Sequence, residues 1–185
     1  MTDNMRRGLA GLLGLGAVDL FTGGLVTVAL AAERTTPPIT EREFNRRTGH
    51  ATVDMVLGEY GIGSVDDASY QRKVYGSDKH VMVLFYNNRS QGSKGLAVLI
   101  GLLGKEFGSK FDVFGYKLGE RERASDNMMR HVHRLYGVDK APIVLLYKNS
   151  DLPNVNERIA GGILTYSNLN RMMGIVTKYI NNNII

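Results

Sequence analysis

Cysteine is absent from this sequence of 185 residues, and its absence excludes several kinds of chemistry. A chain without thiols cannot form disulfides, bind an iron–sulfur cluster or a thiolate-ligated metal, or use a cysteine nucleophile. His131 and His133 do not replace that capacity, because residues two apart on a helix point in different directions and cannot chelate one ion. We therefore expect neither a metal site nor a cofactor.

Long runs of positive charge are also missing, although the net charge is +5. Lysines and arginines are dispersed along the chain, so the sequence does not indicate a nucleic-acid partner. The composition of 43% hydrophobic and 22% charged residues is typical of a folded globular protein.

The amino-terminal residues 1–31 are predicted to be an export signal. Met5-Arg6-Arg7 precedes the mostly apolar stretch Gly8–Ala32, in which Ala29-Leu30-Ala31 has the small-x-small pattern that a signal peptidase accepts. Asp19 interrupts this long stretch, so an uncleaved membrane anchor within residues 8–32 is the first alternative. A buried glycine-rich helical hairpin or an organellar presequence is the second. The signal and the anchor both predict an extracytoplasmic protein, periplasmic or secreted, soluble after cleavage or anchored at a membrane.

Residues 32–58 are expected to form a linker followed by a short helical extension. Thr40-Glu41-Arg42-Glu43 has the Ser/Thr-x-x-Glu form of a capping box, which marks the start of a helix. Gly49 interrupts the pattern that follows, so two short helical pieces are expected. The main domain then spans residues 59–181, and residues 182–185 form a C-terminal tail.

Strand and helix patterns alternate through the main domain. Val81–Tyr86 is a continuous run of apolar, β-favouring residues, as expected for a central strand covered on both faces. Ser125 can cap a helix that Gly137 is well placed to end. Strands are expected over residues 59–65, 81–86, 111–118, 143–147 and 158–163, with helices over residues 66–75, 96–107, 126–136 and 169–180. This order predicts an α/β fold with a mixed central sheet and helices on both faces.

Several segments of the main domain, taken in order, resemble the thioredoxin-like family. Val81-x-Val83-x-Phe85-Tyr86 looks like the family's lead-in to its active site, and Ser90-Gln91-Gly92-Ser93-Lys94 stands where the family has C-x-x-C-K. Tyr136-Gly137-Val138 followed by Ala141-Pro142-Ile143 is similar to the family's helix end, its cis-proline and the strand behind it. Gly161-Gly162 falls where a family glycine is expected. The resemblance implies a thioredoxin-like fold.

Serines at the family's active-site positions, Ser90 and Ser93, determine what the resemblance implies about activity. A serine hydroxyl can neither form a mixed disulfide nor be oxidised to a disulfide, so this sequence excludes thiol–disulfide exchange. The chain is either a naturally redox-inactive member or an oxidoreductase whose two cysteines were replaced by serine. The neighbouring Asn88 and Arg89 also depart from the family's Trp-Cys-Gly-Pro-Cys pattern, which favours the natural version.

Peptide binding is the function that the resemblance leaves in place. Members of the family pair an extended peptide with the backbone beside the cis-proline, which corresponds here to Ala141 and Pro142, with Tyr86 on the neighbouring strand. Such β-augmentation takes its affinity from main-chain hydrogen bonds. We therefore expect a redox-inactive protein-binding module, either a chaperone-like adaptor or a subunit of a membrane-associated assembly, with an unidentified protein partner.

The start of the following helix has a second, weaker interpretation. A serine hydroxyl is expected to cap the helix, and its free N–H groups, with Arg89 and Lys94 nearby, could attract a carboxylate or phosphate. The G-x-x-x-x-G-K-[ST] pattern of a nucleotide-binding phosphate loop is absent.

The same helix carries a second apolar side, formed by Val98 and Leu102 beside Gly101. Small residues recur along it at a spacing that lets another helix approach closely. Two alternatives stay open. This side packs inside the chain, under residues 40–57, or it is a subunit contact that makes a homo-oligomer or part of a larger assembly.

Overall fold

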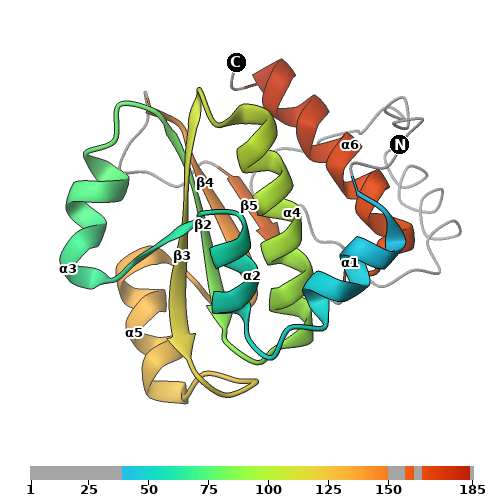
Figure 1. Cartoon of the computed structure of the whole chain (residues 1–185). Helices are drawn as coiled ribbons and strands as arrows, with labels where there is room; N and C mark the ends of the chain where they lie inside the picture. Colours follow the sequence, from blue (N-terminus) through green and yellow to red (C-terminus); the bar gives the residue numbers. More distant parts are fainter. Residues whose placement is uncertain (1–38, 150–156, 161–163, 184–185) are drawn as a thin grey trace, which may run out of the picture.

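The computed structural model describes residues 39–149, 157–160 and 164–183 (Figure 1). The predicted signal or anchor over residues 1–31 lies outside these residues, as do Gly161-Gly162. Within the described residues no helix is both long and apolar enough to span a bilayer.

A five-stranded mixed sheet forms the centre of the fold, which confirms the predicted α/β class. Its order is β1-β3-β2-β4-β5, and β2 runs parallel to β3 and antiparallel to β4. The strands are β1 Gly63–Val65, β2 His80–Asn87, β3 Phe111–Gly119, β4 Ile143–Tyr147 and β5 Glu157–Ala160. This mixed topology is compatible with a thioredoxin-like architecture.

Helices cover both faces of the sheet, as the alternating pattern predicts (Figure 1). The helices are α1 Glu41–Thr48, α2 Val53–Glu59, α3 Asp67–Tyr70, the π-helical turn η1 Gln71–Tyr75, α4 Gln91–Phe107, α5 Asp126–Tyr136 and α6 Tyr166–Asn183. Helices α1, α2, α4 and α6 share one core with one face of the sheet, whereas α3, η1 and α5 share the other.

Local signals place most helix ends where the sequence predicts them. The Thr40 hydroxyl accepts from the Glu43 N–H and starts α1, and Gly49 ends it. The Glu43 carboxylate does not complete the capping box by accepting from the Thr40 N–H, and it accepts from Arg47 instead. The Ser125 hydroxyl caps α5, as expected.

The first strand differs from its prediction. A strand was expected from residue 59, but α2 continues through Glu59 and the chain turns at Gly61, whose φ is 69°. A positive φ of this size favours glycine, because it has no Cβ to clash with the backbone. Strand β1 therefore begins only at Gly63 and pairs with β3 over three residues.

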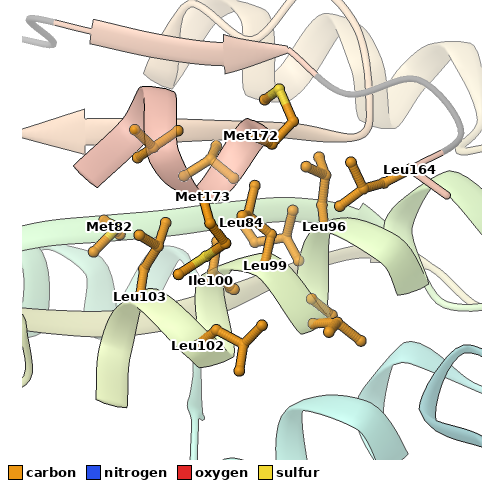
Figure 2. Close-up of a cluster of buried hydrophobic side chains, with 14 of the residues drawn as sticks. Met82, Leu84, Leu96, Leu99, Ile100, Leu102, Leu103, Leu164, Met172 and Met173 are labelled. Carbon is orange, nitrogen blue, oxygen red and sulfur yellow. The ribbon is translucent and has the colours of Figure 1, made fainter. Parts of the chain in front are cut away.

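Helix α4 is buried on nearly every side. Figure 2 shows Leu96, Leu99 and Leu103 of this helix packed among Met82, Leu84 and Met173, whereas Leu102 points away from them. A helix that is apolar all round needs such cover. The other face of the sheet is built on aromatic rings, with Tyr70 stacked on Tyr136 at a centroid distance of 4.2 Å.

Candidate functional site

The end of β2 and the start of α4 hold the family's active-site positions, and both serines there bind backbone groups. The Ser90 hydroxyl accepts from the Ser93 N–H at 3.4 Å and caps α4, as predicted. The Ser93 side chain is 0% exposed, and its hydroxyl accepts from the Asn87 N–H at 3.4 Å. A buried, hydrogen-bonded hydroxyl without a neighbouring base is a structural group and not a nucleophile.

Residues 141–142 lie at the same end of the sheet as these serines. The peptide bond between Ala141 and Pro142 is cis, as the resemblance predicts, and both side chains are half-buried. Strand β4 begins at the next residue, Ile143, which pairs with Phe85 of β2. Continuing this antiparallel register brings residues 141–142 alongside the end of β2, where the Ser90 loop begins.

Tyr86 does not line a peptide site, so that prediction is wrong. Its side chain is 1% exposed, and its hydroxyl donates to Asp54 Oδ1 at 2.5 Å. Alternation along β2 turns Tyr86 toward the core that it shares with Met82 and Leu84. Helix α2 then covers the tyrosine from outside.

Of the two alternatives left open for Val98, Gly101 and Leu102, the subunit contact is contradicted. Val98 is 0% exposed and Leu102 is 7% exposed, because α1 and α2 cover this side of α4 within the same chain. The ring of Tyr60 lies so close to Gly101 that an added Cβ would come within 2.4 Å of it. The small residue therefore serves intrachain packing, the other alternative that the sequence left open.

A polar cluster that the sequence did not reveal joins α2 to the ends of β2 and β3. Asn88 is buried, and its carbonyl oxygen accepts from the Val53 N–H at 2.8 Å while its side-chain amide donates to Asp54 Oδ2 at 2.8 Å. Lys117 Nζ donates to Asp54 at 2.7 Å and to Glu120 at 2.7 Å. These bonds hold the chain before Ser90 against both α2 and β3.

Electrostatics in this cluster stabilise the charged forms. Burial opposes ionisation of Asp54, but hydrogen bonds from Lys117 and Tyr86 outweigh it and lower the pKa of the carboxyl. The hydrogen bond to Asp54 raises the pKa of Lys117, with Glu120 adding to it. Because Lys117 binds both carboxylates, the cluster is suited to holding the loop in place.

A second unforeseen cluster lies on the opposite face of the sheet, around the carboxylate of Asp67. Both Tyr116 and Tyr136 donate their hydroxyls to Asp67 Oδ1 at 2.6 Å, and His131 Nε2 lies 2.6 Å from Oδ2. The histidine thus links α5 to the start of α3. Its side chain is half-buried.

Long separations in sequence explain why neither cluster was foreseen. Asp54 and Lys117 are 63 residues apart, and Asp67 and Tyr136 are 69 apart. No spacing rule for helices or strands connects such pairs. The tyrosines themselves were the available signal, because a buried tyrosine hydroxyl needs a hydrogen-bond partner.

Within the described part of the chain, no group of three or more histidine, aspartate or glutamate side chains is arranged to hold a metal ion. Comparison with known protein families matches no family model, and comparison with curated proteins finds no relative.

Proposed function

We propose that this chain is a redox-inactive, thioredoxin-like module that binds an extended segment of a partner protein beside Ala141 and Pro142. The observation that carries the proposal is the contrast between two neighbouring features. The hydroxyls of Ser90 and Ser93 already bind backbone N–H groups, whereas the residues at 141–142 stay half-exposed. The site is therefore better suited to contact than to covalent chemistry.

The framework around this position supports binding of a peptide backbone. Asn88 ties the adjoining loop to α2, and its own N–H donates to the Gly119 carbonyl at 2.9 Å, so the loop is held from two sides. A loop that is already ordered loses little conformational freedom when a ligand binds, which favours affinity. The side chain of Asn87, the last residue of β2, is buried beside this loop.

We further propose an extracytoplasmic location for the protein, as an adaptor or as a subunit of a membrane-associated assembly. This part of the proposal rests on the pattern of residues 1–31 alone. Amino-terminal sequencing of the cellular protein should begin near Ala32, and an intact Met1 on a cytoplasmic species would contradict it.

The binding proposal is tested by removing the main-chain donor at position 141. Ala141→Pro deletes the N–H that would pair with the partner's strand. Cross-linking in native envelopes, followed by mass spectrometry, should recover the same partner with wild type and with the control Ser90→Ala, and lose it with Ala141→Pro. Thermal unfolding checks that each variant is folded. Equal recovery with all three proteins would contradict binding at this edge.

The competing function is a thiol–disulfide oxidoreductase whose cysteines were replaced by serine. The buried Ser93 beside the more exposed Ser90 is the observation in its favour, since one accessible and one shielded thiol would suit attack and resolution. Cysteine codons at 90 and 93 in the native gene would establish this alternative. The variant Ser90→Cys with Ser93→Cys should then reduce a protein disulfide, whereas under our proposal it has no natural reductant or substrate.

A further inference from the structure

Strand β3 extends beyond its neighbour β1 and leaves an open edge. Strand β1 pairs with β3 only from Gly63 opposite Phe114 to Val65 opposite Tyr116. Among the residues that the structure describes, the first three residues of β3, 111–113, therefore have β2 on one side and no paired strand on the other.

The chain that could have filled this gap turns away from it. The Ile62 N–H donates to the Leu57 carbonyl at 3.0 Å, so it closes the end of α2 instead of pairing with β3. Successive residues of a strand turn their peptide groups to opposite sides, so at least one of residues 111–113 presents its N–H and C=O to the gap. An edge of this kind is a template for another strand.

A cavity of about 300 Å³ lies along the open edge. Its lining comes from residues 60–63, from residues 111–114 of β3, and from Gly101, Gly104 and Lys105 of α4. Gly104 leaves space beside β3, because a Cβ at this position would lie 3.2 Å from Val113 Cγ2. The volume is at the small end of ligand pockets and suits a few residues of extended chain.

The charge around the cavity favours an acidic occupant. Asp112, the carboxylate on its lining, is already paired with Lys79 at 3.4 Å and accepts a hydrogen bond from the Ser77 hydroxyl at 2.9 Å. Lys105 Nζ lies 5.2 Å from the centre of the Tyr60 ring, and within the described residues it forms no ion pair. The uncompensated charge at the cavity is thus positive.

We propose that the open edge of β3 binds an extended acidic peptide segment of another protein as an additional short strand. Main-chain hydrogen bonds to residues 111–113 give the affinity, and Lys105 selects a carboxylate on the side chain that faces α4. This site is separate from the one at Ala141 and Pro142, which lies near the other end of β2. The two sites can therefore be tested independently.

The test uses a fluorescein-labelled heptapeptide of alternating threonine and valine with a central glutamate, titrated against the full chain by fluorescence anisotropy. We expect saturable binding below about 1 mM. Methylating the peptide's alternate backbone nitrogens should weaken binding at least about tenfold, because strand addition depends on main-chain donors. Bound peptide should also slow amide exchange within residues 111–113.

Protein variants locate the site. Gly104→Leu fills the cavity and should abolish binding, whereas the matched control Gly58→Leu on α2, with no atom within 4 Å of the added Cβ, should not. Lys105→Glu is an exposed change that leaves the fold intact, and it should weaken binding about two- to fivefold. Replacing the central glutamate of the peptide by lysine should restore affinity for that variant. Ala141→Pro should have no effect.

Three results would each overturn the proposal: no saturable binding at about 1 mM peptide, equal binding of the methylated peptide, or equal binding by Gly104→Leu and Gly58→Leu. If Gly104→Leu fails to fold, the deciding result is whether the peptide with a central lysine regains affinity for Lys105→Glu; no gain in affinity would overturn the proposal. Loss of the probe with Ala141→Pro alone would place peptide binding at the other site.

Discussion

Asp67→Asn removes a negative charge that two tyrosines and a histidine share. In the wild type one carboxylate oxygen accepts hydroxyls from Tyr116 and Tyr136, each at 2.6 Å, and the other oxygen faces His131. Asparagine keeps the shape and one acceptor oxygen. The substitution therefore measures the value of the charge and not the loss of all contacts.

The expected cost follows from the two tyrosine hydrogen bonds at Asp67. A hydrogen bond to a charged acceptor contributes about 1.5–3 kcal/mol and a neutral one about 0.5–1.5 kcal/mol, so each hydroxyl loses about 1 kcal/mol. Two hydroxyls would give about 2 kcal/mol, but the Asp67 side chain is 45% exposed and water screens its charge. We expect Asp67→Asn to lower the free energy of unfolding by about 1 kcal/mol.

The direction in which the stability changes with pH provides a second test of the same substitution. Burial opposes ionisation of Asp67, but hydrogen bonds from Tyr116 and Tyr136 outweigh it and lower the pKa of the carboxyl. A lowered pKa in the folded state stabilises the protein above the ordinary aspartate value of about 3.9, and this contribution is lost as the pH falls through the folded pKa. The difference in the free energy of unfolding between wild type and variant should therefore be largest near neutral pH and should disappear in acid.

Urea unfolding followed by tyrosine fluorescence, at pH 7 and at several acid values, measures this difference. Asp139→Asn is the matched control, because Asp139 is exposed on the loop after α5. A double-mutant cycle with Tyr116→Phe should show coupling between the two residues. If Asp67→Asn unfolds like Asp139→Asn at pH 7, or if its deficit persists unchanged in acid, the reasoning is refuted.

Two further predictions concern the cover of α4. Gly101→Val should lower the free energy of unfolding by about 1–3 kcal/mol, because the new side chain would overlap the Tyr60 ring; Gly58→Val, in open space, should cost less than half as much in the same urea titration. Glu59→Gln removes a carboxylate that accepts from Arg46 at 2.6 Å and whose pKa is lowered to about 2 by that bond. The stability difference from wild type should be present above about pH 4.3 and disappear toward pH 2, and 1 M salt should reduce it at neutral pH; a difference that salt leaves unchanged would argue against an ion pair.

The parts of the fold that depend on local chemistry could be predicted from the sequence. Ser125 and Gly137 mark the ends of α5, because a cap hydroxyl and a left-handed glycine act on groups within one turn. The run Val81–Tyr86 identified the central strand, since continuous apolar residues need cover on both faces. Neither inference requires knowing what lies elsewhere in the chain.

The parts that failed depend on which distant segment covers which surface. Val98 and Leu102 were recognised as a second apolar side of their helix, but nothing in their spacing says whether the covering helix belongs to the same chain. Tyr86 follows the family's pattern, yet Asp54 of the extension reaches its hydroxyl and α2 covers it. The resemblance says nothing about residues 40–60, so it could not anticipate this cover.

The covering of α4 by α1 and α2 also has a consequence for the order in which the protein is made. Helices α1 and α2 leave the ribosome before the surface that buries them, which comes from residues 91–119 and from α6. Short isolated helices are only marginally stable in water, so α1 and α2 are not stably helical before the residues that cover them have been made. Contacts so far apart in sequence form slowly. The newly made amino-terminal half therefore exposes Phe44, Val53 and Val56 until α4, β3 and finally α6 are made, and exposed apolar surface of this kind favours aggregation.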